Sequence, residues 1–126
     1  MNKPNQITLG RIFIDFHDLE EIHIQHSALP AIGESSFWPG KNIRILNLSF
    51  NRFTMIRDTD FNNLTNLKEL YLSDNRLSHA PSASFRYLLN LTKLILARNK
   101  FTKLVPRLFY KLDKLIYLDL SENPIQ

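Results

Sequence analysis

The sequence contains no cysteine and only three glycines among its 126 residues. Without cysteine the chain forms neither disulfide bonds nor thiolate metal sites, and so few glycines leave no glycine-rich loop to cradle a phosphate. No apolar run approaches the roughly 18 residues that a membrane-spanning helix needs. Hydrophobic residues nevertheless make up 44% of the chain, which is enough to build a core and excludes a disordered tail. The length leaves room for one domain.

The most prominent feature that is present is an internal repeat of 24 residues. Five segments share the spacing of their apolar residues and start at positions 19, 43, 67, 91 and 115, with no insertion or deletion between them. Their sequences are LEEIHI, IRILNL, LKELYL, LTKLIL and LIYLDL. Apolar and polar residues alternate at the end of each segment, which predicts a short strand with one buried face. Such a strand is not stable alone, so we expect successive strands to stack into a parallel sheet.

Other positions keep the same period when each repeat is numbered in columns from the first residue of its segment. Column nine contains Ser27, Asn51, Asn75, Asn99 and Asn123. Column nineteen contains Phe13, Phe37, Phe61, Phe85 and Phe109. Column fourteen contains Ile32, Ile56, Ala80 and Leu104. A buried amide must be hydrogen-bonded, so the asparagines are expected to tie each turn to the next. The phenylalanines are expected to fill the core behind the sheet.

The full pattern, LxxLxLxxNxLxxLxxxxFxxLxx, resembles the leucine-rich repeat in its 24-residue typical form, over residues 19–126 and as a half repeat over residues 7–18. The resemblance implies an α/β fold class: a right-handed solenoid with short parallel strands on a concave face, and 3₁₀ turns and irregular segments on the convex face. Pro39, Pro81 and Pro106 would break any longer helix there. The resemblance also implies that Asn51, Asn75, Asn99 and Asn123 form an asparagine ladder, from which Ser27 departs.

The predicted organisation is a partial N-terminal repeat at residues 1–18 and five repeats over residues 19–126, the last one truncated. Solenoids need capping repeats because their terminal coils expose core-type faces. The cysteine-bearing caps common in extracellular members of the family are not found here. We therefore expect the chain to be a piece of a larger ectodomain, with a small free-standing repeat protein as the alternative.

Columns two, three, five, seven and eight are expected to face the concave surface, because side chains alternate along a strand. Family members usually bind partners there. The candidate ligand-binding residues are Ile45, Phe50, Tyr71, Asp74, Lys93, Ile95, Arg98 and Tyr117. Clusters of exposed apolar residues mark interaction sites and aromatic anchors dominate interface energetics, which favours binding roles for Tyr71 and Phe50. The alternative is scattered surface apolar residues, which are normal.

Opposite charges follow one another in three of these columns. The sets are Asp74, Arg98 and Glu122 in column eight, Glu69 and Lys93 in column three, and Glu20 and Arg44 in column two. Cross-strand pairs of opposite charge contribute about 0.2–1 kcal/mol each. We interpret these charges first as support for strand register and only second as recognition.

Charge is also uneven along the chain, because residues 12–40 contain no lysine or arginine while residues 86–114 are strongly basic. Such a field could steer an anionic partner such as a sulfated glycan. The basic residues are spread around the coil, however, whereas a binding footprint should be clustered. The predicted partner is therefore another protein, with an anionic glycan as a minor alternative and no nucleic acid.

Three sequons, at Asn47, Asn63 and Asn90, match the acceptor pattern for N-glycosylation and favour an extracellular or cell-surface location. Asn63 and Asn90 occupy outward columns, whereas a glycan on Asn47 would block the concave face. A cytoplasmic location is the alternative, since the lack of cysteines is natural there.

No catalytic constellation is present: there is no cysteine nucleophile, no nucleophile elbow and no convincing serine–histidine–carboxylate set. His23 and His26 lie close together without an evident third metal ligand, so neither a metal nor another cofactor is expected. The predicted function is non-catalytic protein recognition through the concave sheet, in adhesion, guidance or innate-immune signalling. The alternatives are an intracellular scaffold and a structural spacer without a ligand.

Overall fold

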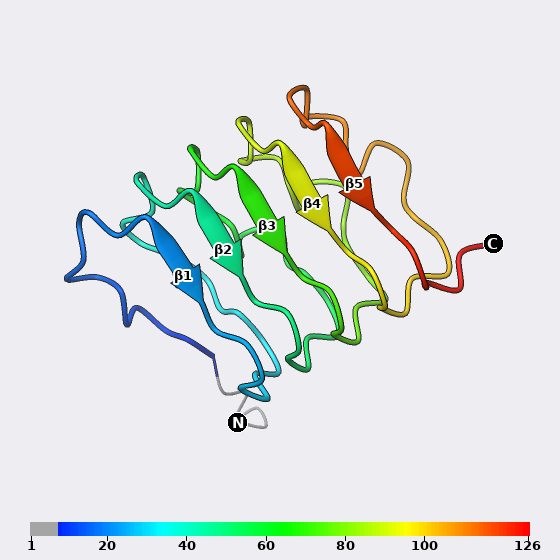
Figure 1. Cartoon of the computed structure of the whole chain (residues 1–126), viewed down its shortest axis with the longest axis horizontal. Helices are drawn as coiled ribbons and strands as arrows, with labels where there is room; N and C mark the ends of the chain where they lie inside the picture. The colour runs from blue at the N-terminus through cyan, green and yellow to red at the C-terminus, as the bar shows by residue number, and fades with distance from the viewer. Residues whose placement is uncertain (1–7) are drawn as a thin grey trace, which may run out of the picture.

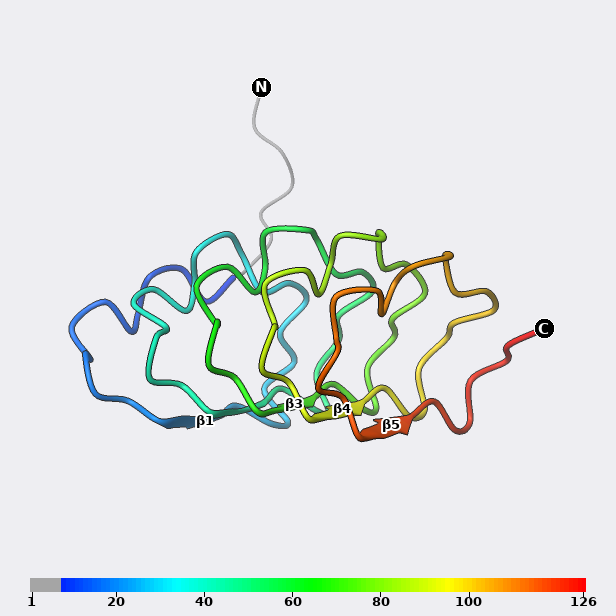
Figure 2. The same ribbon diagram turned by 90° about the horizontal axis from the view of Figure 1, so that it is seen from above.

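The computed structural model describes residues 8–126 and shows one parallel sheet of five strands in chain order (Figure 1). The strands are β1 (Glu21–His23), β2 (Ile45–Asn47), β3 (Glu69–Tyr71), β4 (Lys93–Ile95) and β5 (Tyr117–Asp119). Figure 2 shows the strands along one side of the molecule and the connecting segments along the other. Each repeat therefore makes one coil of a solenoid, which confirms the predicted architecture. Part of the predicted partial repeat, residues 1–7, lies outside the described residues.

The strand register follows the 24-residue period directly. Leu46 pairs with Leu70, and Leu70 pairs with Leu94. These central residues are fully buried while their strand neighbours are only half-buried. Because successive side chains point to opposite faces of a strand, column four enters the core and columns three and five face outward. A one-residue slip would exchange the two faces, so the buried leucines fix the register.

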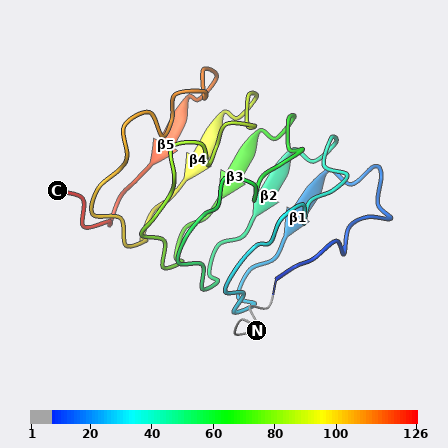
Figure 3. The same cartoon turned by 180° about the vertical axis from the view of Figure 1, so that it is seen from behind.

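The convex side is built from single turns, which are nearest the viewer in Figure 3. Three equivalent turns illustrate the pattern, in which an N–H donates to the carbonyl three residues earlier: Asp60 to Arg57 at 3.2 Å, Ser84 to Pro81 at 2.9 Å and Leu108 to Val105 at 3.2 Å. These turns do not continue into a helix anywhere in residues 8–126. The same part of the chain therefore has no helix that could cross a membrane.

The column-nineteen phenylalanines fill the core behind the sheet. Phe37, Phe61 and Phe85 are at most 1% exposed. The ring centroids of Phe61 and Phe85 lie 6.1 Å apart, and those of Phe85 and Phe109 lie 6.3 Å apart with nearly parallel planes. These rings stack from coil to coil over Phe61, Phe85 and Phe109, and the stack couples neighbouring repeats through apolar burial.

The column-nine asparagines form a row at the turn that leaves each strand. The amide nitrogen of Asn75 donates to the carbonyl of Leu48 in the coil before it and to the carbonyl of Leu72 in its own coil, at 3.1 and 3.2 Å. Its Oδ1 accepts the backbone N–H of Phe53 at 3.2 Å. Asn51, Asn99 and Asn123 repeat this arrangement. We call these four residues the buried ladder.

The first coil lacks this amide because column nine holds Ser27. The Ser27 hydroxyl is exposed and donates only to the carbonyl of Gln25, at 3.1 Å. Asn51 from the next coil compensates in part, since its Oδ1 accepts the backbone N–H groups of both Ser27 and Leu29. Within the described residues, the turn of the first coil is therefore held from the side of the second coil.

Candidate binding surface on the concave face

The centre of the concave face is an apolar pair from two adjacent strands. Tyr71 of β3 and Ile95 of β4 are register partners, and both are half-buried. The Tyr71 hydroxyl donates to Oε1 of Glu69 at 2.5 Å. Partial burial and this bond to a carboxylate together raise the pKa of Tyr71 to about 12. Tyr71 is therefore neutral and oriented at physiological pH, with its ring available beside Ile95.

Lys93 and Tyr117 form a second outward pair, on β4 and β5. The Lys93 ammonium lies 5.4 Å from the centroid of the Tyr117 ring, within cation–π range. Tyr117 is 52% exposed, which makes it more accessible than Tyr71. The predicted ion pair between Glu69 and Lys93 is not formed between these described residues. Their charged groups turn instead to Tyr71 and Tyr117 on the same face.

Column eight forms a continuous row along the rim of the sheet, where the chain leaves each strand. The rings of His26 and Phe50 stack with centroids 4.5 Å apart, and Phe50 remains 42% exposed. Arg98 donates to both carboxylate oxygens of Asp74, at 2.9 and 3.1 Å, and its outer nitrogen lies 3.4 Å from Glu122. These hydrogen bonds raise the pKa of Arg98 above its already high ordinary value. The row therefore has an aromatic half and an ionic half.

The backbone of this rim is strained in every coil. Column eight takes a left-handed conformation throughout, with φ between 54° and 60° at His26, Phe50, Asp74, Arg98 and Glu122. Among residues other than glycine, asparagine, aspartate and histidine enter this region most often, and each instance costs about 1–3 kcal/mol. The buried ladder that follows directly in column nine holds the turns closed. In this conformation the column-eight side chains lie on the rim rather than in the core.

A strip of small residues separates the rim from the centre of the sheet. In column seven, Ser49, Ser73 and Ala97 are buried, and the Ser73 hydroxyl donates to that of Ser49 at 3.1 Å. Contact with a partner therefore falls to the side chains on either side of this buried strip, such as Tyr71 and Phe50.

The concave columns carry more negative than positive charge, although the whole chain is formally +4. They hold six carboxylates, Glu20, Glu21, Glu69, Asp74, Asp119 and Glu122, against four cations, Arg44, Lys68, Lys93 and Arg98. Near the start of β1–β3, a hollow of about 250 Å³ mixes both signs around Ile45, and Arg44 lies 4.0 Å from Glu20 at its edge. The excess of positive charge thus lies away from the sheet face.

The three sequon asparagines differ in how their side chains are engaged. Asn47, at the end of β2, accepts the backbone N–H of Ser49 at 3.1 Å. Asn90 donates to the carbonyl of Thr65 at 2.7 Å and accepts from the ammonium of Lys114 at 2.7 Å. Asn63 has a left-handed backbone with φ of 73° and makes no side-chain hydrogen bond to another described residue. Within the described residues, Asn63 is therefore the sequon whose amide is bonded through neither of its polar atoms, whereas Asn47 is bonded through its oxygen alone and Asn90 through both.

A second asparagine row, which the sequence reasoning missed, lines the opposite edge of the sheet. In column twenty-four, Asn42, Asn66 and Asn90 donate to the carbonyls of His17, Lys41 and Thr65, at 2.7, 2.8 and 2.7 Å. We call these three asparagines the exposed ladder, because their bonds lie at the surface. The signal was present as asparagine at one column in three consecutive repeats.

Comparison with known proteins settles the family. The leucine-rich-repeat family model matches residues 41–91 and 89–126, well over half of the chain. The chain belongs to the leucine-rich-repeat family. No curated protein sequence matches this leucine-rich-repeat chain as a relative.

Solved structures with the same fold include two receptors. The TLR13–ssRNA13 complex is 29% identical with a TM-score of 0.88, and the match covers 92% of this chain and 16% of that one. The Toll–Spatzle complex of Drosophila is 27% identical with a TM-score of 0.82 and coverages of 88% and 15%. The glycosylated form of that complex is 27% identical with a TM-score of 0.84, and the match covers 94% of this chain and 17% of that one. This chain thus spans about one sixth of each solved chain. Because one of them is an RNA complex, the comparison does not support the prediction that a nucleic-acid partner is absent.

Proposed function

We propose that this chain is a non-catalytic recognition module of a cell-surface or secreted leucine-rich-repeat protein, and that it binds another protein through the concave sheet. The partner meets the aromatic centre at Tyr71, Ile95 and Tyr117 and the rim at Phe50, Asp74 and Arg98. Adhesion, guidance and innate-immune signalling are the processes that such modules serve.

The observation that carries this proposal is the contrast between core and concave columns. Columns six and nineteen keep one residue type in nearly every repeat, whereas column five changes from His23 to Asn47, Tyr71, Ile95 and Asp119. The solenoid does not need these identities for stability, yet they include exposed aromatic and apolar groups. Interface cores are enriched in tyrosine, phenylalanine and arginine, which are the groups on this face. The surface spans five strands, or about 20–25 Å at the usual strand spacing.

Two further observations support a protein partner. The Toll–Spatzle complex has a fold similar to this chain and is an assembly of a receptor with a second protein. The sheet face itself carries more carboxylates than cations. A polyanion would therefore meet net repulsion there, whereas a protein surface of mixed charge would not.

Single-stranded RNA is the second candidate partner, because the TLR13 structure is an RNA complex. The RNA would have to bind the excess lysines and arginines away from the sheet face, since phosphate contacts dominate nucleic-acid affinity. Titration of a labelled single-stranded RNA at two salt concentrations tests this candidate. Affinity that falls steeply with salt and survives changes on the sheet face would favour RNA over protein recognition.

The test of the main proposal is affinity capture from extracellular and cytosolic extracts with the whole chain as bait. Phe50→Asp/Tyr117→Asp places two carboxylates on the concave face at side chains that are 42% and 52% exposed. Exposed substitutions change stability little, so the variant should stay folded. The matched control is Ile12→Asp/Leu89→Asp, which adds the same charge at exposed apolar residues off the sheet face.

We expect wild type and control to retain a partner that the concave variant loses. Equal capture by all three proteins would remove the concave face from the account and leave the structural-spacer alternative. Capture only from cytosolic extract, lost by the concave variant, would instead favour the intracellular scaffold.

The proposed location is tested by expression in a secretory eukaryotic host followed by glycopeptide mass spectrometry. Asn63 should be occupied before Asn90, because the Asn90 amide nitrogen donates to Thr65 and its oxygen accepts from Lys114. Absence of glycan from all three sequons would remove this support for an extracellular location.

A further inference from the structure

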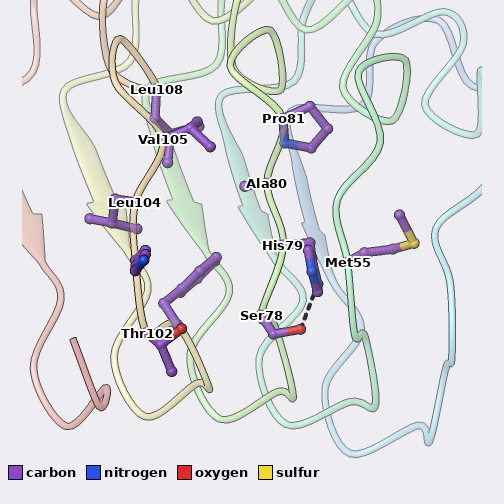
Figure 4. A pocket seen from close by; sticks show the side chains of 11 residues that line it. Met55, Ser78, His79, Ala80, Pro81, Thr102, Leu104, Val105 and Leu108 are labelled. Atoms are coloured by element: carbon purple, nitrogen blue, oxygen red, sulfur yellow. Dashed lines mark hydrogen bonds between the residues drawn. The ribbon is translucent and has the colours of Figure 1, made fainter. Parts of the chain in front are cut away.

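Behind the sheet, the repeat departs from its own pattern at Ala80. The other residues of column fourteen are large, and Ile32 and Ile56 are 2% and 0% exposed. Alanine lacks most of such a side chain, and protein cores otherwise pack with few voids. The space opens to the surface as a hollow of about 470 Å³ (Figure 4), which we call the apolar hollow.

The apolar hollow lies between the convex segments of two adjacent coils. Figure 4 shows the segment that carries Leu104, Val105 and Leu108 facing the segment that carries Ser78 to Pro81, with the sheet behind both. Phe101 and Leu108 form part of the lining and are 1% and 3% exposed. The volume falls within the usual range of about 300–1,000 Å³ for small-molecule sites.

The chemistry of this hollow favours hydrocarbon over peptide. Seven of its eleven lining residues are apolar, and two of the four polar ones, Ser78 and His79, are hydrogen-bonded to each other at 2.8 Å. The other two are Thr102 and Lys103. A peptide backbone placed there would leave polar groups unpaired, and an unpaired buried amide costs about 1–3 kcal/mol. An alkyl or aromatic group carries no such penalty and gains about 0.8 kcal/mol per buried methylene.

A second hollow, of about 230 Å³, lies beside the first and is lined by cations. Arg86, Arg107 and Lys111 contribute to its wall together with Tyr110, and no carboxylate lines it. None of these three cations forms an ion pair within residues 8–126. Their neighbours are tyrosines: Arg107 and Lys111 lie 5.3 and 5.4 Å from the Tyr110 ring centroid, and Arg86 lies 4.7 Å from that of Tyr87. We call this site the basic hollow.

The two hollows adjoin, because Leu108 lines both and the linings continue along the same two chain segments. An apolar cavity that runs into an uncompensated cluster of three cations is complementary to a molecule with the opposite arrangement. We propose that the two hollows together bind one anionic amphiphile. Its hydrocarbon part occupies the apolar hollow, and its phosphate, sulfate or carboxylate head contacts Arg86, Arg107 and Lys111.

Guanidinium groups suit such a head because they bind phosphate and carboxylate oxygens with two parallel hydrogen bonds. This site is separate from the concave surface and independent of the proposed function. Phe50→Asp/Tyr117→Asp should therefore bind the amphiphile as wild type does. The two proposals can fail separately.

The experiment is isothermal titration of the whole chain with dodecyl phosphate below its critical micelle concentration. Dodecyltrimethylammonium carries the same tail with the opposite charge, and inorganic phosphate supplies the head alone. We expect one site for dodecyl phosphate, bound about tenfold or more tightly than either control ligand. Vesicles of phosphatidylcholine with phosphatidic acid form a further arm, which separates a free amphiphile from a membrane surface.

Variants with matched charge locate the site. Arg86→Gln/Arg107→Gln/Lys111→Gln removes the cations of the basic hollow. Arg52→Gln/Arg76→Gln/Lys100→Gln removes the same number and types of cation in column ten, none of which lines either hollow. The first should weaken binding about tenfold or more and the second less than about threefold, because close charges dominate over net charge. Ala80→Ile, which restores the column-fourteen pattern, and Val105→Glu should each weaken binding about tenfold, with folding checked by circular dichroism.

Several results would overturn the proposal. If both triple variants lost affinity for dodecyl phosphate equally, net charge alone would explain the binding. If Ala80→Ile and Val105→Glu kept the wild-type affinity, the apolar hollow would not be part of the site. Inorganic phosphate bound as tightly as dodecyl phosphate would leave a simple anion site, and binding to vesicles alone would assign the cations to a membrane surface. A glutamate–leucine octapeptide that binds with the predicted variant pattern, where dodecyl phosphate does not, would assign the hollows to a protein.

Discussion

The two edges of the parallel sheet are both held by asparagines, yet the two rows differ in depth and in number of bonds. In the buried ladder, Asn75 is 6% exposed and joins its own turn to the coil before it through both ends of its amide. In the exposed ladder, Asn66 is solvent-exposed and donates one bond to the previous coil, to Lys41. Asparagine thus forms buried hydrogen bonds between coils at one edge of the sheet and a solvent-exposed hydrogen bond between coils at the other.

This difference indicates that separate sets of residues stabilise the solenoid and form the proposed partner surface. Buried amides and stacked phenylalanines couple the coils, and their columns keep one residue type except at Ser27. The sheet face between the two ladders contributes little to that coupling. It is therefore free to carry different side chains in each repeat, and the proposed partner surface lies there.

The largest expected effect comes from the middle of the buried ladder. Asn75→Ala leaves the Leu48 and Leu72 carbonyls and the Phe53 N–H without this partner. The two carbonyls keep amide donors from Asn51 and Asn99, so the Phe53 N–H is the buried group left unpaired. One such group costs about 1–3 kcal/mol, and the free energy of unfolding should fall by about that amount. Urea denaturation followed by circular dichroism measures it. A loss below about 1 kcal/mol would contradict a central role for the buried ladder.

A gain of stability is expected where the buried ladder is incomplete. Ser27→Asn supplies the missing amide in the first coil, within reach of the turn that Asn51 now holds from one side. The site is exposed, so the gain should be modest, about 0.5–1 kcal/mol. Thermal unfolding against wild type checks the direction. An unchanged midpoint would mean that the row needs a coil on both sides of each asparagine.

The exposed ladder should respond less than the buried one to the same substitution. Asn66→Ala removes the bond to Lys41 at a site where water can replace the amide. We expect a loss of about 0.5 kcal/mol, as for a typical solvent-accessible hydrogen bond. The urea experiment that measures Asn75→Ala serves here too. If the two variants lost equal stability, burial would not explain the difference between the edges.

The smallest expected effect concerns the ionic half of the rim. Arg98→Gln breaks the contacts to Asp74 and Glu122, both at the surface. Exposed ion pairs contribute little and are screened by salt. The stability of the variant should lie close to that of wild type and converge with it at high salt. A large loss that persists in salt would assign these residues to the fold rather than to recognition.

Period alone was sufficient to predict the core. The leucines of columns four and six, the phenylalanine stack and the placement of five parallel strands follow from spacing, because each occupies a column that the repeat keeps constant. The strands β1 to β5 fall at the predicted columns for this reason. The roles of Asn51, Asn75 and Asn99 were accessible because a buried amide has few ways to be satisfied.

The repeat did not predict which side chains of neighbouring coils contact one another. Glu69 was paired with Lys93 because they are register neighbours, but its carboxylate is nearer to the Tyr71 hydroxyl on its own strand. The hollow at Ala80 depends on how far adjacent coils separate behind the sheet. Along the sequence, positive charge is concentrated in residues 86–114. In the structure, the relevant division is between the sheet face, which has more carboxylates than cations, and the remaining surface, which carries the positive excess.

Site-specific photo-crosslinking tests the central claim most directly. The photoreactive amino acid p-benzoylphenylalanine is placed either at position 117, on the concave face, or at position 89, whose leucine is 51% exposed off the sheet face. Each protein is then irradiated with the partner that wild type captures. The account predicts a covalent complex from position 117 and none from position 89. A complex from position 89 alone would contradict recognition through the concave sheet.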